Sequence, residues 1–213
     1  MRIISLLSLL MVVVFSGCQS TQFTATWTTD NHDARQFDKL LIVGMSRNIP
    51  ARTTVEDEVV YYMRVKQIRA VAGSDVLPVD RSQVPKEKEA MQAFLKKNGI
   101  DGILTVSLLD VKKETKYVQG SNYYAPTTFY GGYYGSFYNY YPSMYSNVYQ
   151  PGYYANSQVV YLETNLFDVA SGDLIWSAQS DTQDKTEIDD LANSYARGLV
   201  THVVKRKIIK PVQ

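Results

Sequence analysis

The side chains that most often perform catalysis are sparse in this sequence and do not occur in a catalytic spacing. The chain of 213 residues contains two His and one Cys. It has no GxSxG, GxxxxGK[ST] or HExxH motif. His32 lies in a polar N-terminal stretch and His202 near the end of a predicted helix, so we interpret each as a solvated or packed residue. We therefore expect a protein that is not an enzyme, with no cofactor and no metal site.

The composition excludes further classes of function. The 22 Lys and Arg nearly balance the 21 Asp and Glu, so the net charge of +1 provides no basic surface for nucleic acid. The content of 45% hydrophobic and 20% charged residues is typical of a globular chain. A single Cys excludes an intramolecular disulfide and a Cys-based zinc site. The unusual number is 17 Tyr.

The one Cys lies directly after an apolar run at the N-terminus. Residues 3–15 form this run, which is shorter than the roughly 20 residues that span a bilayer and has the length of a signal-peptide core. The small residues Ser16 and Gly17 precede Cys18. This pattern resembles the bacterial lipobox, which implies cleavage between Gly17 and Cys18 and acylation of Cys18, with palmitate among its acyl chains. An ordinary secretory signal or an uncleaved anchor is the alternative.

Acylation would hold the protein firmly on a membrane, since each buried CH₂ contributes about 0.8 kcal/mol. Gln19, rather than Asp, follows the Cys, and resemblance to lipoprotein sorting then implies the outer membrane, with the chain facing the periplasm. We expect a signal peptide over 1–17, the lipidated Cys and a tether over 18–38, and an α/β domain over 39–207. An insertion over 117–158 interrupts this domain, and 208–213 form a tail.

Hydrophobic patterning before the insertion predicts alternating strands and helices. The apolar run 40–43 is typical of a strand buried on both faces. A helix is predicted over 53–72, a short edge strand over 76–79, a second helix over 85–98 and a third strand over 103–111. The acidic residues 56–58 start the first helix, where they complement the helix macrodipole.

After the insertion, a hairpin and a helix are predicted. Alternation over 159–169 and the run 174–180 indicate two strands joined by a turn at Gly172. In the last helix, one face is apolar, with Ile188, Ala192, Tyr195, Leu199 and Val203. The order βαβαβ, insertion, ββα predicts an α/β sandwich, with a mixed sheet and helices packed on it.

The insertion contains most of the Tyr residues and no charge. No Asp, Glu, Lys or Arg occurs over 117–162, and Gly and Pro interrupt any regular pattern. One hypothesis is a contact surface, because Tyr gives large, stiff, amphipathic area; the other is a low-complexity loop that collapses on its own domain. The candidate contact residues are Tyr123, Tyr124, Tyr130, Tyr133, Tyr134, Tyr138, Tyr140, Tyr141, Tyr145, Tyr149, Tyr153 and Tyr154.

Three segments carry a resemblance to a family of small bacterial outer-membrane lipoproteins. They are FDKLLIV over 37–43, NGIDGIL over 98–104, and LFDVASGDLIW over 166–176. The domain is similar to the TolB N-terminal domain, the curli-secretion lipoprotein and the lipoprotein activators of penicillin-binding proteins. The resemblance implies a binding or assembly module. The insertion does not match the membrane hairpins of the secretion lipoprotein.

The leading hypothesis is a non-catalytic binding or assembly module of the cell envelope, anchored to the outer membrane. Its expected partners are the membrane, through Cys18, and an envelope protein or a glycan, with no nucleic acid; self-assembly into a homo-oligomer stays open. The alternatives are a subunit of an oligomeric export or secretion ring and, less favoured by the residues, an envelope hydrolase.

Overall fold

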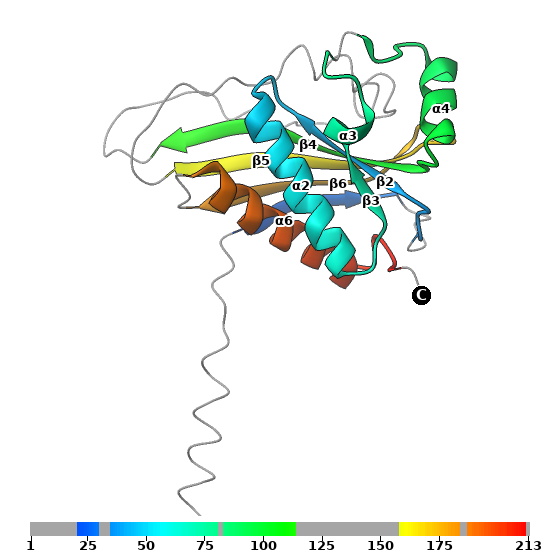
Figure 1. The fold of residues 1–213 in the computed structure, drawn as a ribbon. Coiled ribbons are helices and arrows are strands. Elements are labelled where there is room, and N and C mark those ends of the chain that lie inside the picture. Colours follow the sequence, from blue (N-terminus) through cyan, green and yellow to red (C-terminus); the bar gives the residue numbers. More distant parts are fainter. Residues whose placement is uncertain (1–20, 30–34, 81–82, 114–157, 184–186, 212–213) are drawn as a thin grey trace, which may run out of the picture.

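The protein folds around a single six-stranded mixed sheet (Figure 1). The computed structural model describes residues 21–29, 35–80, 83–113, 158–183 and 187–211. The sheet has the order β1-β6-β5-β4-β2-β3. Its strands are β1 (Thr21–Thr28), β2 (Leu40–Met45), β3 (Ala70–Ala72), β4 (Gly102–Lys113), β5 (Gln158–Asp168) and β6 (Leu174–Gln183). Strand β2 runs parallel to β3 and β4, and the other pairs are antiparallel.

Four helices pack against this sheet in the described ranges. They are α2 (Ile49–Val65), α3 (Gly73–Val76), α4 (Lys88–Lys97) and α6 (Ile188–Lys205). Helices α2 and α6 lie side by side on one face, whereas α4 lies at one end of the sheet (Figure 1). The predicted fold class, an α/β domain with helices on a mixed sheet, is therefore confirmed.

The larger hydrophobic core lies between the sheet and the pair α2 and α6. One side of every central strand enters it, including Leu104, Leu166 and Trp176, all nearly fully buried. The predicted apolar face of α6 is buried from Ala192 to Val203, whereas Ile188 is 38% exposed. A second, smaller core lies beneath α4, where Met91 and Leu95 meet β2 and β4.

The predicted hairpin is formed by β5 and β6. Gly172 has a φ of 85°, a left-handed conformation that favours glycine. Asp168 closes the turn, because its Oδ1 accepts a hydrogen bond of 2.8 Å from the backbone N–H of Ser171. Arg35 forms an ion pair with the other oxygen of this carboxylate. The aspartate and glycine of this segment thus build the turn itself.

The segment 98–102 also has a structural role. Gly99 has a φ of 68°, and Asp101 accepts hydrogen bonds from the backbone N–H groups of Asp38 and Lys39 at 2.9 and 3.0 Å. A Cβ at Gly102 would lie 2.5 Å from a ring carbon of Phe37. Two of the three segments that carried the family resemblance therefore hold each other in place at the start of β2 and β4.

The structure differs from the sequence expectation at the N-terminal edge. Residues 21–28 were assigned to the tether, but they form the edge strand β1, antiparallel to β6. Phe23, Ala25 and Trp27 alternate with exposed polar residues along it. The hydroxyl groups of Thr21 and Thr182 are hydrogen-bonded at 2.9 Å across the pair. The Thr-rich composition obscured an alternation that the neighbouring strand stabilises.

The second expected strand was wrong in position. Helix α2 ends at Val65. The residues Ala70–Ala72, which the sequence analysis assigned to the end of this helix, form the strand β3. Gly73–Val76 is a short helix, and Val79 is 74% exposed. The position of β3 is determined by its parallel pairing with three residues of β2, and a strand of three residues is too short to show an alternating pattern in the sequence.

Glu56 has a different role from the one expected of the acidic start of a helix. It is fully buried in the second turn of α2. Its carboxylate accepts hydrogen bonds from the backbone N–H of Gly44 at 2.9 Å and of Ser74 at 2.6 Å. A buried carboxylate is tolerated only when it is so satisfied. Glu56 therefore ties α2 to the end of β2 and to α3.

Candidate functional site

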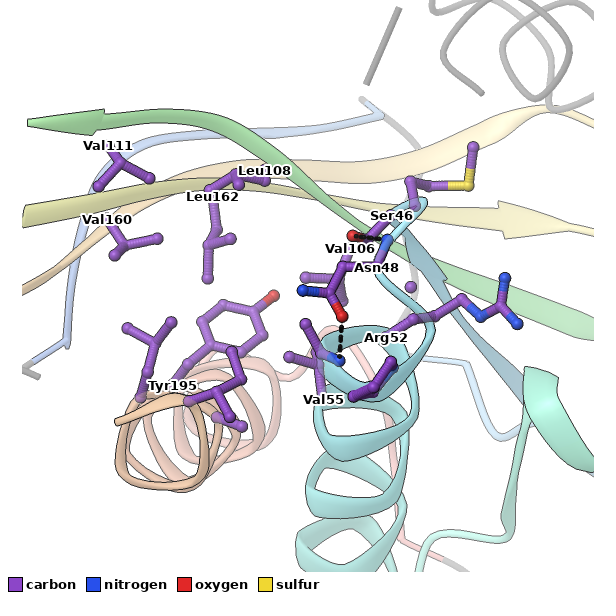
Figure 2. A pocket seen from close by; sticks show the side chains of 17 residues that line it. Ser46, Asn48, Arg52, Val55, Val106, Leu108, Val111, Val160, Leu162 and Tyr195 are labelled. Atoms are coloured by element: carbon purple, nitrogen blue, oxygen red, sulfur yellow. Dashed lines mark hydrogen bonds between the residues drawn. The ribbon is translucent and has the colours of Figure 1, made fainter. Parts of the chain in front are cut away.

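An apolar pocket of about 240 Å³ lies between α2, α6 and the sheet (Figure 2). Its floor is formed by side chains of β4 and β5, and its two sides by the N-terminal halves of α2 and α6. The pocket exists because the two helices start apart on this face, so the side chains between them do not fill the space. The apolar lining residues are Met45, Pro50, Ala51, Val55, Val106, Leu108, Val111, Val160, Leu162, Ile188, Leu191 and Ala192.

The N-terminus of α2 contributes the polar part of the rim. Asn48 caps the helix, since its Oδ1 accepts a hydrogen bond of 3.1 Å from the N–H of Ala51. Ser46 Oγ in turn accepts a hydrogen bond of 3.1 Å from the N–H of Asn48 (Figure 2). The start of α2 is thereby fixed against the end of β2, and the rim on this side is preorganised.

Arg52 lies at the edge of the pocket, and its guanidinium points away from the apolar lining (Figure 2). Arg52 is only 4% exposed, and its Nε has no hydrogen-bond acceptor in the described part of the chain. The side chain passes close over β2, because a Cβ at Gly44 would lie 2.9 Å from Arg52 Cγ. A buried guanidinium donor without an acceptor is costly, but this Nε is enclosed and does not open into the pocket.

Tyr195 closes the opposite side of the pocket (Figure 2). Its hydroxyl is 2.5 Å from Thr164 Oγ1, and the residue is fully buried. Burial raises the pKa of the Tyr195 hydroxyl far above its usual range, while the hydrogen bond to Thr164 acts in the other direction. The phenol is therefore neutral and already partnered, which makes it a wall of the pocket rather than an acid or base.

The chemistry of the pocket suits binding. Its lining contains neither a nucleophile next to a base nor a pair of carboxylates. No group of three or more His, Cys, Asp or Glu that could hold a metal occurs within the described residues. The lining is mostly apolar, so the arrangement fits an apolar group of a ligand or partner.

Two exposed isoleucines begin the helices that bound the pocket: Ile188 lines it, and Ile49 stands in the chain between the lining residues Asn48 and Pro50. Ile49 at the start of α2 is 50% exposed, and Ile188 at the start of α6 is 38% exposed. Large apolar side chains exposed beside an apolar pocket extend the surface that a partner would cover. Sequence reasoning missed this site, and the only signal was an apolar residue at the first position of each helix.

The residues singled out in the sequence lie mostly elsewhere. Cys18, Gly17 and the twelve candidate Tyr residues of the insertion are outside the described residues. His202 is packed, as one of its two interpretations expected: its ring centroid is 4.2 Å from that of Phe23. Burial, and then the nearby Arg206, lower the pKa of His202. The pocket is lined by residues that the sequence analysis proposed for no site, although Ile188, Ala192 and Tyr195 belong to the predicted apolar face of α6.

No described helix has the length and apolar character needed to cross a bilayer.

Comparison with known proteins identifies no family: no family model matches the sequence, and no curated protein matches it. Among solved structures, the fold is similar to the PelC dodecamer from Paraburkholderia phytofirmans, with a TM-score of 0.48, 12% identity, and coverage of 85% of this chain and 95% of that chain. Lipoprotein GNA1162 from Neisseria meningitidis is similar with a TM-score of 0.40 and 11% identity, over 80% of this chain and 96% of that chain. Likeness at this level identifies neither the family nor the function.

Proposed function

We propose that this protein is a lipid-anchored component of the bacterial cell envelope whose α/β domain is a non-catalytic binding module. The anchor is Cys18, which stands after an apolar run of signal-peptide length and small residues. Gln19 directs the protein to the outer membrane, with the domain in the periplasm. The absence of catalytic motifs from the sequence supports a binding role over hydrolysis.

The pocket between α2 and α6 is the observation that carries the binding role. It is preformed, lined by apolar side chains and flanked by Ile49 and Ile188. A partner protein that inserts an apolar side chain would bury this surface, which contributes about 25 cal/mol per Å². The proposed partner is therefore an envelope protein with an exposed apolar segment.

The pocket is tested by crosslinking in intact cells. A photoreactive residue placed at position 49 or 188 should capture one partner, whereas the same residue at position 65 should not. Val65 is the matched control, because it is exposed to 57% but lies at the far end of α2. Ile188→Lys should remove the product formed at position 49, and Val65→Lys should keep it. Equal capture at all three positions would refute the pocket as the binding site.

The nature of the captured product distinguishes the oligomeric alternative. If the crosslink joins two copies of this chain, the pocket binds another copy, and the proposal becomes self-assembly into a ring rather than binding of a partner protein. Native mass spectrometry of the detergent-solubilised protein then measures the number of copies, and a strict monomer excludes the ring.

The anchor is tested separately by fractionation of cells. Cys18→Ala should release the protein from the membrane fraction or leave its precursor unprocessed, because no acyl chain can be attached. Gln19→Asp should keep the protein acylated and move it from the outer to the inner membrane. Continued acylation of the Cys18→Ala variant would overturn the proposed anchor.

The insertion is proposed as a second contact surface. Deletion of 120–157 should leave the domain folded, because β4 and β5 pair with each other over their full length, from Gly102 opposite Asp168 to Lys113 opposite Gln158, and the deletion removes no residue of either strand. The same deletion should abolish recovery of the partner in a pull-down. An unchanged set of recovered proteins would eliminate the contact role of the tyrosines.

A further inference from the structure

The edge strand β1 begins three residues after Cys18, the proposed site of acylation. Only Gln19 and Ser20 lie between Cys18 and Thr21. An extended chain advances by at most about 3.6 Å per residue, so Thr21 lies within about 11 Å of Cys18. The tether expected over 18–38 could have extended to roughly 70 Å. The pairing of β1 with β6 therefore removes most of the freedom that a lipid-anchored domain would otherwise have.

Strand register shows which residues share the end of the sheet where Thr21 lies. A row of directly paired residues crosses four strands, from Thr21 through Thr182 and Val160 to Val111. Beyond this row β4, β5 and β6 continue by one or two residues each. Helix α6 starts beside this end (Figure 1). We call the row and the residues beyond it the anchor end: Thr21, Val111, Lys112, Lys113, Gln158, Val159, Val160, Thr182 and Gln183.

The opposite end of the sheet carries the turn between β5 and β6. Asp168 begins this turn and follows Val160 by eight residues in the same strand. A strand rises by about 3.3 Å per residue, so these two residues are about 26 Å apart. This distance exceeds the reach of the connection from Cys18 to Thr21. The turn therefore approaches the membrane only if the strands lie flat on it.

The exposed side chains favour strands that rise from the membrane over strands that lie flat. A flat sheet would rest on β1, the strand that follows the anchor, and its exposed side chains, Gln22, Thr24 and Thr26, are polar and uncharged. At the anchor end Lys112 is exposed and lies over the ring of Tyr161, with 5.3 Å from its Nζ to the ring centroid. Lysine and tyrosine both suit the headgroup layer of a bilayer, because each has an apolar body and a polar tip.

We propose that the anchor end lies against the phospholipid headgroups and that the strands rise from the membrane, so that the turn between β5 and β6 faces away from it. This placement rests on the proposed acylation of Cys18. The exposed carboxylates of Asp189 and Asp190 at the start of α6 require water. The contact is therefore with the headgroups and does not extend into the hydrocarbon.

The placement restricts the partner of the pocket. Val111 and Val160 belong to the anchor end and also line the pocket. Neighbouring strands are about 4.8 Å apart, so Val160, two strands from Thr21, lies about 10 Å from it. The pocket is thus beside the membrane surface, and the partner proposed for it must present its apolar segment there.

Quenching of a single fluorophore by headgroup-labelled lipid tests the placement. The acylated full chain is reconstituted into vesicles of phosphatidylethanolamine and phosphatidylglycerol that contain a lipid with a nitroxide on its headgroup. Cys18 is the only Cys of the chain, and its acylated form has no free thiol, so a Cys introduced elsewhere takes the fluorophore alone. Fluorophores at Lys112→Cys and Gln183→Cys should be quenched severalfold more strongly than one at Thr26→Cys. All three positions are exposed, and Thr26 is the matched control because it lies further along the edge strand β1.

Two further variants complete the measurement. Ala170→Cys places the fluorophore at an exposed position of the far turn, where quenching should be absent. Insertion of about twelve Gly and Ser residues between Ser20 and Thr21 adds a root-mean-square reach of about 20 Å. Quenching at Gln183→Cys should then fall to the level at Ala170→Cys, while the protein remains on the vesicles.

Three results would overturn the placement for a protein that is bound to the vesicles. Equal quenching at positions 26 and 183 would mean that the strands lie flat. No quenching at either position 112 or 183 would mean that the anchor end is held away from the membrane. Unchanged quenching at position 183 after the insertion would mean that the short connection does not set the placement. A chain that is not acylated and does not bind the vesicles refutes the anchor itself, so the two failures are distinguishable.

Discussion

The two faces of the central strands differ sharply although the same strands build them. On the face covered by α2 and α6, β4 and β5 present Leu104, Val106, Leu162 and Leu166 to a continuous apolar core. On the other face the intervening positions carry buried polar residues, among them Thr105, Ser107, Glu163 and Asn165. The strand period of two lets one sequence serve both purposes. One face provides stability, and the other retains unsatisfied polar atoms that stability alone does not explain.

The largest effect should distinguish the two tryptophans, one on each face. Trp176 is 1% exposed within the core beneath α6, whereas Trp27 lies partly buried on the edge strand. Trp176→Ala should lower the free energy of unfolding by about 3–5 kcal/mol, because it leaves a cavity. Trp27→Ala should cost only about 1–2 kcal/mol. Urea denaturation measures both, and equal losses would show that the two faces contribute alike.

Exchanging neighbouring residues of β4 should give effects of opposite sign. Val106→Thr places a hydroxyl in the apolar core and should cost roughly 1–3 kcal/mol. Thr105→Val removes a buried hydroxyl without a partner and should raise the free energy of unfolding by about 1 kcal/mol. The same urea titrations measure the change. A loss of stability in Thr105→Val would mean that the hydroxyl has a structural partner.

The neighbouring pair in β6 repeats this comparison with smaller side chains. Ala178→Ser adds a hydroxyl to the core and should destabilise by about 1 kcal/mol, whereas Ser177→Ala should be neutral or slightly stabilising. Differential scanning calorimetry should give a lower Tm for Ala178→Ser and an unchanged or higher Tm for Ser177→Ala. Two shifts in the same direction would contradict the assignment of these residues to different faces.

The smallest effect is a pH dependence on the helical face. The pKa of His202 is lowered by burial and by Arg206, so the folded state favours the neutral ring. Above the ordinary value of 6.5 both states are neutral and stability is complete. As the pH falls through 6.5, the unfolded state takes up the proton first, and stability is lost until the folded pKa is passed. His202→Phe retains an aromatic partner for Phe23 and should flatten the change of Tm between about pH 7.5 and 5.5.

The parts of the fold with strong local patterns could be predicted from the sequence. Strands β4, β5 and β6, the turn at Gly172 and the buried face of α6 all follow from alternation, turn residues and helical spacing. Strand β1 and the short β3 could not be placed, because their residues become strands only through pairing with β6 and β2. Glu56 was interpreted through its own helix, although its partners are Gly44 and Ser74.

The sequence by itself was enough to predict lipid attachment at Cys18, to show that no catalytic motif is present, and to reveal the alternation that separates the two faces of the sheet. Only the tertiary structure decided that the starts of α2 and α6 leave an apolar pocket beside Arg52, and that polar residues from three strands meet in one array. The physical reason is that local sequence determines which way a side chain points, whereas the residues it meets depend on strand register and helix packing between distant segments.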